Sequence, residues 1–217
     1  MRSPKSLVSA AGALLAVVAF ACSGGNAPGA PTSDSSTSNP TAGRLSIRLT
    51  DSPFSDAQAL LVTFSEVSVH RADPGEWKTI PFVTGSSRTC DLKQLKDAID
   101  LLGVGSLPAG KYTQIRLNVT SAALYFDNAS ATGPCAAQIA APAGESAPVD
   151  IPSGEVKLNN EFTVAGSGTT ITLDFDGDQS VLQTGSGNSN GNGNGRGGTN
   201  SSKKYMMVPV IRVVSVQ

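Results

Sequence analysis

The sequence has little of what most enzymes and nucleic-acid-binding proteins use. Of its 217 residues only 15% are charged, the formal net charge is −1, and His70 is the single histidine. One histidine removes most zinc sites and leaves His-dependent triads without support. The near-zero net charge gives no basis for binding nucleic acid or an anionic surface.

Motifs for catalysis are also missing. No pair of carboxylates stands in the apolar setting that a glycosidase needs. Gly105 to Lys111 has the spacing of a phosphate-binding loop, but Tyr112 occupies the position of the magnesium-binding Ser or Thr. A strand, not a helix, is expected after it. We therefore predict a protein that is not an enzyme, holds no nucleotide and needs no organic cofactor.

The longest apolar run, Leu7 to Phe20, has 14 residues and is shorter than the roughly 20 needed to span a bilayer. Arg2 and Lys5 precede it, and a small residue, Ala21, ends it, which is typical of an export signal. We predict a signal peptide over residues 1–21.

Cys22 follows the predicted cleavage site and resembles the lipidated first residue of bacterial lipoproteins. Lipidation is favoured over simple secretion because a polar segment without a core follows at once, and acyl chains bind membranes at ~0.8 kcal/mol per buried methylene. By the same resemblance, Ser23 implies sorting to the outer membrane. The protein is expected to be exported and membrane-anchored there, facing either the periplasm or the cell surface.

Residues 22–43 are rich in Gly, Pro, Ser, Thr and Asn, so they predict a flexible tether ahead of a folded domain over residues 44–217. Within that domain, residues 184–203 are almost wholly Gly, Asn and Ser. Such low complexity favours a disordered loop over a binding loop that orders on contact.

Alternation with a period of two dominates the domain. It is clearest after the Pro108–Gly110 turn, where one face is expected to carry Thr113, Ile115, Leu117 and Val119. One dry and one wet face predict an antiparallel β-sandwich. Leu45 to Leu49 predicts a further strand, and a change of phase near Ser65–Glu66 predicts a bulge.

One helix is expected, over Asp91–Leu102, because four apolar residues recur there at intervals of three and four: Leu92, Leu95, Ile99 and Leu102. Cys90 precedes it. In an oxidising compartment, with Cys22 acylated, Cys90 and Cys135 are left as an even pair, which favours a disulfide over two free thiols.

Two groups of residues are candidate ligand sites. Asp174, Asp176 and Asp178 flank Gly177 and could gather around calcium, although the later glutamate of a full calcium loop is missing; the alternative is a solvated strand end. A second group, Trp77, Tyr112 and Tyr125, could form an aromatic platform for sugar rings, or could belong to the core.

A resemblance covers essentially Arg44 to Val216. It is carried by dispersed segments: Leu45–Pro53, Val67–His70 with Trp77, Leu107–Leu117, Val156–Leu158, Leu173–Asp176 with Ser180, and Pro209–Arg212. Together they resemble the domain of unknown function 4382 family of bacterial and archaeal exported proteins. The resemblance implies a prealbumin-like or carbohydrate-binding-like sandwich, often in a lipoprotein, and brings no catalytic residues.

The expected function is therefore a non-catalytic binding module on a cell-envelope lipoprotein, with a glycan or an envelope protein as its partner. The alternative is a purely structural or assembly role in the envelope. An exposed set of Trp77, Tyr112 and Tyr125 would favour glycan binding, whereas burial of all three would favour the structural or protein-partner role.

Overall fold

The computed structural model describes residues 41–52, 55–96, 98–184 and 203–217. The predicted signal peptide, Cys22, most of the tether and nearly all of the predicted Gly/Asn/Ser loop lie outside these residues. Among the described residues, no helix is long and apolar enough to cross a membrane. The first strand begins at Ala42, two residues before the predicted start of the domain.

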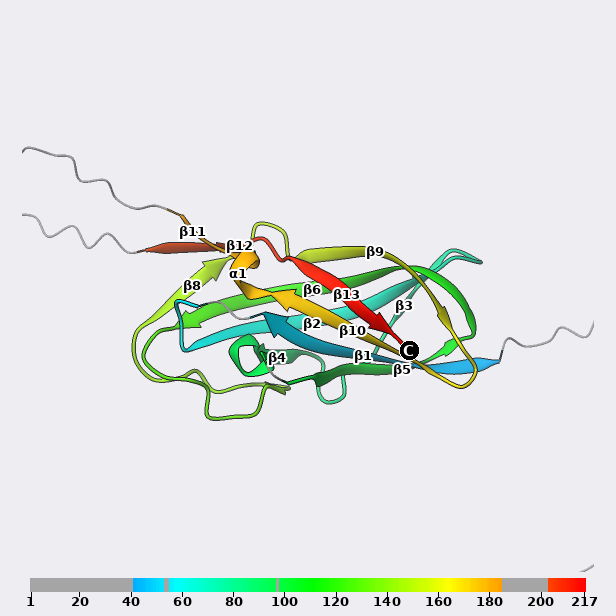
Figure 1. Cartoon of the computed structure of the whole chain (residues 1–217), viewed down its shortest axis with the longest axis horizontal. Helices are drawn as coiled ribbons and strands as arrows, with labels where there is room; N and C mark the ends of the chain where they lie inside the picture. Colours follow the sequence, from blue (N-terminus) through cyan, green and yellow to red (C-terminus); the bar gives the residue numbers. More distant parts are fainter. Residues whose placement is uncertain (1–40, 53–54, 97, 185–202) are drawn as a thin grey trace, which may run out of the picture. The chain divides into compact units, whose positions relative to one another are not determined.

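The strands form two sheets (Figure 1). The four-stranded sheet has the order β13 (Ile211–Val216), β10 (Thr169–Asp176), β1 (Ala42–Ser52) and β5 (Asp100–Pro108). The nine-stranded sheet has the order β11 (Val181–Thr184), β12 (Lys204–Met207), β8 (Ser146–Asp150), β6 (Gly110–Tyr125), β2 (Ala59–Arg71), β4 (Arg88–Asp91) and β7 (Cys135–Ala136). In addition, β3 (Glu76–Thr79) pairs with β2, and β9 (Glu155–Val164) pairs with β6. The two short helical turns are η1 (Leu92–Leu95) and α1 (Gly177–Ser180).

The predicted all-β sandwich is confirmed, because both sheets contribute to one buried cluster of aliphatic and aromatic side chains. Most strand pairs are antiparallel, as predicted, but β1 pairs with β10 and β8 pairs with β12 in parallel. Alternation along a strand favours an antiparallel sheet in general, but it does not fix the direction of each neighbouring strand. The antiparallel description therefore holds for the sheets in general and not for these two pairs.

Strand β6 is the central strand that its alternation predicts, with β2 on one side and β8 and β9 on the other. Ile115, Leu117 and Val119 are buried as expected. The register of β6 against β9 shifts between Tyr112 and Gln114, so Tyr112 enters the core in place of Thr113. The turn before β6 contains Gly110 at φ 144°, in agreement with the predicted positive φ.

Strand β2 confirms the predicted change of phase. Its pairing with β6 shifts between Phe64 and Glu66, so Phe64 before the irregularity and Val67 after it both face the core. A β-bulge adds one residue to a strand, so the buried positions change from even-numbered residues before it to odd-numbered residues after it. This keeps one face of the 13-residue strand against the core on both sides of the bulge.

The predicted helix over Asp91–Leu102 is wrong. Only Leu92–Leu95 form a helical turn, capped by the Asp91 side chain, and β5 begins at Asp100. Ile99, which the pattern placed on the buried stripe, is 57% exposed. Leu92 and Leu95 are buried below the turn and Leu102 is buried from a strand, so two different elements produce the apparent helical spacing.

Candidate binding face

The outer face of the nine-stranded sheet carries regular rows of polar side chains where β3, β2, β6 and β9 lie next to one another. Strand register places Trp77 opposite His70, His70 opposite Gln114, and Gln114 opposite Asn159. The next row contains Thr79, Ser68, Arg116 and Lys157. We call these two rows, with Glu155, the outer face.

Trp77 lies half-buried at one end of the outer face. The guanidinium carbon of Arg116 lies 3.9 Å from the centre of its ring, and the His70 ring lies 5.1 Å away at an interplanar angle of 57°. A cation over an indole face is attracted by the ring quadrupole. One face of Trp77 is therefore covered by Arg116, and the ring is not the bare platform predicted from the sequence.

Charged groups continue the outer face along β9. Arg116 Nε lies 3.1 Å from Glu155, and Lys157 Nζ lies 2.7 Å from the same carboxylate. The hydrogen bond from Lys157, together with the charge of Arg116, holds the pKa of Glu155 below its ordinary value. Two cations and one anion leave this part of the outer face with a positive charge.

Hydrogen bonds fix the remaining polar residues of the outer face. Gln114 Nε2 donates to Asn159 at 2.8 Å, and His70 Nδ1 lies 3.0 Å from the Thr113 hydroxyl. Thr113 is the residue that the β6 bulge moves out of the core. The bulge thus supplies a polar partner for the chain's one histidine.

Tyr112 does not belong to a ligand platform. It is fully buried, its hydroxyl donates to the Pro108 carbonyl at 2.9 Å, and its ring stacks on Phe162 with centres 5.4 Å apart. Burial raises the pKa of the Tyr112 hydroxyl above its ordinary value. The prediction that Tyr112 is a sugar-binding residue is wrong, because the bulge turns it into the core.

Tyr125 is half-buried and lies at the opposite end of β6 from Tyr112. It lines a separate hollow with Thr63, Thr89 and Ser121. Trp77, Tyr112 and Tyr125 are therefore not brought together, and the three-residue platform predicted from the sequence does not exist.

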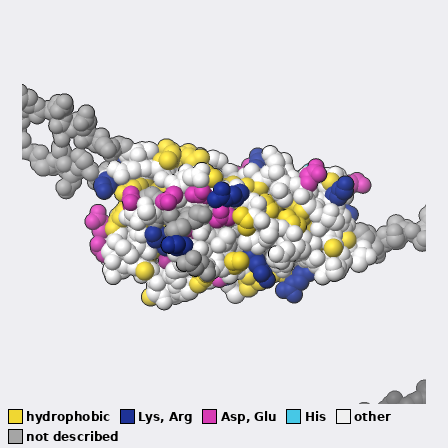
Figure 2. Space-filling view, viewed as in Figure 1, with side chains coloured by type: hydrophobic (Ala, Val, Ile, Leu, Met, Phe, Trp, Pro, Cys, Tyr) yellow, Lys and Arg dark blue, Asp and Glu magenta, His cyan; other side chains and the backbone are white. Residues whose placement is uncertain are grey.

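The predicted calcium ligands are held by other partners. Arg212 Nε donates to Asp174 at 2.9 Å, and Arg212 Nη2 lies 3.4 Å from Asp176. Asp176 also caps α1 by accepting from the Gln179 amide at 3.0 Å, while Asp178 accepts from the Ser55 amide at 3.0 Å. Figure 2 shows acidic and basic side chains next to one another around α1.

Within the described part of the chain, no group of three or more His, Cys, Asp or Glu side chains is arranged to hold a metal ion. The predicted gathering of Asp174, Asp176 and Asp178 around calcium is corrected accordingly. Sequence spacing placed Asp174 and Asp176 on one face, which is right, but it did not reveal that Arg212 of the last strand forms ion pairs with both of them.

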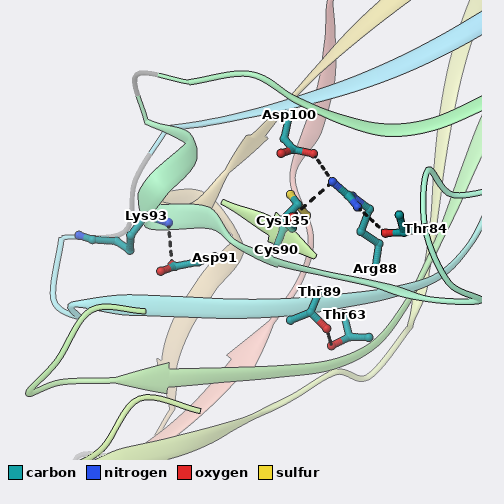
Figure 3. Close-up of a disulfide and its surroundings, with 9 residues drawn as sticks. All are labelled: Thr63, Thr84, Arg88, Thr89, Cys90, Asp91, Lys93, Asp100 and Cys135. Carbon is teal, nitrogen blue, oxygen red and sulfur yellow. Dashed lines mark hydrogen bonds and ion pairs between the residues drawn. A yellow bond between two sulfur atoms is a disulfide. The ribbon is translucent and has the colours of Figure 1, made fainter. Parts of the chain in front are cut away.

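Cys90 and Cys135 form the predicted disulfide (Figure 3). The two residues are opposite one another in the pairing of β4 with β7, with Cα atoms 4.1 Å apart. Beside the disulfide, Arg88 pairs with Asp100, donates to the Cys135 carbonyl at 3.4 Å and donates to Thr84 at 3.2 Å. These contacts hold the segment around β7 against β4.

Comparison with known proteins identifies the family. The family model described as "Domain of unknown function (DUF4382)" matches residues 42–192, which is more than half of the chain. The chain belongs to the DUF4382 family. No curated protein and no solved structure matches the chain.

The DUF4382 match contains the whole outer face and the disulfide, and it ends before β12 and β13. Arg212 lies on β13, outside the match, although it pairs with Asp174 and Asp176 inside it. The final two strands thus complete both sheets of the DUF4382 domain in this chain.

Sequence reasoning missed Asp51 of the DUF4382 domain. It is only 4% exposed, and neither carboxylate oxygen has a hydrogen-bond partner among the described residues. Burial raises its pKa to about 8; the nearby Gly177 amide offsets part of this effect, and the carboxylates of Asp174, Asp176 and Asp178 add to it. No local signal identifies it, because its neighbours come from strands more than a hundred residues away.

Proposed function

We propose that this DUF4382 protein is a bacterial envelope lipoprotein, anchored through acylated Cys22 in the outer membrane. Its sandwich acts as a non-catalytic module that binds an envelope glycan or an envelope protein, facing the periplasm or the cell surface. Support for export comes from the leader and Cys22 in the sequence and from the Cys90–Cys135 disulfide, because disulfides persist in oxidising compartments.

The observation that carries the binding role is the arrangement of the outer face. Conformationally restricted strands hold Trp77, His70, Gln114 and Asn159 in one row, all of them at least partly accessible. Rigid aromatic residues with adjacent polar groups are the composition that binding surfaces favour, since little side-chain entropy is lost on association.

A structural role in the envelope is the second candidate, and a specific observation favours it. Arg116 already covers Trp77, and Glu155 already forms ion pairs with Arg116 and Lys157, so the charges of these side chains are partly compensated within the domain. The two roles differ in whether removing these groups affects binding or only stability.

A binding experiment distinguishes the two roles. The full chain, solubilised in detergent, is offered to three separated envelope fractions: polysaccharide, peptidoglycan and outer-membrane protein. The variants are Trp77→Ala and Arg116→Ala. The matched control is Lys78→Ala, which lies next to Trp77 on β3 and pairs with Glu76 at the sheet edge.

We expect at least one fraction to bind the unaltered chain and the control, with binding weakened about tenfold or more in Trp77→Ala. Equal binding of all the variants, or no binding to any fraction, would refute the binding role of the outer face and leave the structural role.

A further inference from the structure

The hollow beside Tyr125 is a second feature of the nine-stranded sheet, separate from the outer face around Trp77. It has a volume of about 230 Å³ and lies over β2, β4 and the end of β6. Its polar wall consists of Thr63, Thr89, Ser121, Tyr125 and Gln138. Leu61 and Ile139 form part of its apolar wall.

The hydrogen-bonding groups of this hollow are neutral and largely unused. Thr63 and Thr89 share one hydrogen bond, with hydroxyl oxygens 3.0 Å apart (Figure 3). The side chains of Ser121, Tyr125 and Gln138 make no hydrogen bond to any residue that the structure describes. No charged residue among the described part of the chain lines the hollow.

The backbone around the hollow is specialised. The register of β2 against β6 shifts between Thr63 and Phe64, so Thr120 has no partner in the pairing. Bulges of this kind redirect side chains and are over-represented next to functional sites. Across the hollow, Gln138 and Ile139 follow directly after β7, which the Cys90–Cys135 disulfide attaches to β4. The disulfide therefore holds one wall of the hollow in place.

We propose that this hollow is a subsite for one neutral sugar residue. An aromatic ring with adjacent aliphatic side chains suits the C–H face of a pyranose, and hydroxyl and amide groups suit its hydroxyl groups. The volume is below the roughly 300–1,000 Å³ of sites for drug-sized ligands, so it suits one residue of a glycan. A uronic acid or a sulfated sugar would bring a charge that no residue in the hollow compensates.

The subsite rests on the proposed binding function and specifies its ligand class. The probes are methyl glycosides of glucose, galactose, mannose and N-acetylglucosamine, offered free in solution and as the same sugars immobilised on a surface. Methyl glucuronide is the charged comparison. Binding is measured with the full chain in detergent, and the two formats distinguish a free sugar from the end of a glycan.

Three variants, one control and one comparison variant test the location. Tyr125→Ala removes the ring, Gln138→Ala removes an amide, and Ser121→Trp fills the hollow from an exposed position that does not contribute to the core. Thr120→Trp is the matched control, since Thr120 is an exposed neighbour that does not line the hollow. Trp77→Ala is the comparison that reports whether binding takes place at the outer face instead.

We expect at least one neutral glycoside to bind, about tenfold weaker binding in Tyr125→Ala and Ser121→Trp, and unchanged binding in the control Thr120→Trp. Three results would overturn the subsite. They are preferential binding of the glucuronide, no binding of any neutral glycoside, and binding of a neutral glycoside that persists in Ser121→Trp. Loss of neutral binding in Trp77→Ala alone would overturn the subsite and support the outer face, so the two proposals fail in different ways.

Discussion

At the scale of single residues, Asp51 is the least expected feature of the molecule. Its register partner is Phe175, which is fully buried, so the Asp51 side chain points to the core side of the four-stranded sheet. Asp174 and Asp176, by contrast, are paired with Arg212 on the other side. A buried carboxyl group without hydrogen-bond partners is more stable in its neutral form.

The substitution Asp51→Asn tests how this buried carboxyl group affects the stability of the domain at different pH values. The pKa is about 8 in the folded chain and 3.8 unfolded, so between these values the folded state binds more protons than the unfolded state. Stability is therefore expected to fall as pH rises from about 4 to about 8. At pH 8 the free energy of unfolding of the variant is expected to be larger than that of the unaltered chain by on the order of 2 kcal/mol, so the variant unfolds at a higher temperature. Its unfolding temperature is also expected to change less with pH.

Thermal unfolding of the full chain between pH 4 and pH 9 measures this effect. Asp91 is a second buried carboxyl group whose pKa is raised by burial, so part of the slope is expected to persist in the variant. An identical slope in Asp51→Asn and in the unaltered chain would show that Asp51 does not titrate as described.

The residues differ in how far the sequence predicts them. Leu45, Ile47 and Leu49 follow the alternation of a single strand, and all three are fully buried as predicted. Asp51 and Tyr112 depend on register and on a bulge, which are set by strands distant in the sequence. Among the predicted ligand residues, Tyr112 is turned into the core by the bulge, and Asp174, Asp176 and Asp178 bind partners from distant segments, which local spacing does not reveal.

At the scale of elements, the edge formed by β4, β7 and η1 shows how local patterns mislead. The spacing of Leu92, Leu95 and Leu102 predicts one helix. In the structure, the first two are buried from a helical turn and the third from the strand that follows it. The cysteine pairing was predictable from compartment and number alone. It is this disulfide, with Arg88 and Asp100, that fixes the edge.

Removing the disulfide, by Cys90→Ala with Cys135→Ala, is expected to lower the free energy of unfolding. The two cysteines are 45 residues apart, and the chain-entropy model gives a loss of about 4 kcal/mol for a loop of that length. Urea unfolding measures the change in midpoint. Cys22→Ala is the matched control, since it removes the third cysteine without affecting the pair, and equal midpoints in all three chains would contradict the structural role of the bond.

At the scale of the whole molecule, the described residues from Ala42 onward form two sheets around one core, and the alternation of β1, β2 and β6 was sufficient to predict this architecture. Parallel pairing of β1 with β10 was not predictable, because pairing direction depends on the path of the chain between them. The proposed anchor belongs to this scale, since it decides where the domain is located.

Cys22→Ala tests the anchor. Without the thiol that accepts the lipid, the exported chain is expected to move from the membrane fraction to the soluble fraction, because the acyl chains on Cys22 supply the proposed membrane attachment. Fractionation with metabolic labelling by a radioactive fatty acid provides the measurement, and Cys135→Ala is the control. Retention of Cys22→Ala in the membrane with undiminished label would exclude the proposed anchor.

Trp77 provides the most direct test of the proposed binding face, because it is the only tryptophan in the chain. Its fluorescence is measured in the full chain as the envelope fraction that binds is added, together with quenching by acrylamide. We predict a shift in emission and reduced quenching that saturate with the binding curve, as expected when a partner covers Trp77 and Arg116. Saturated binding with unchanged emission and unchanged quenching would contradict the proposal that this face binds the partner.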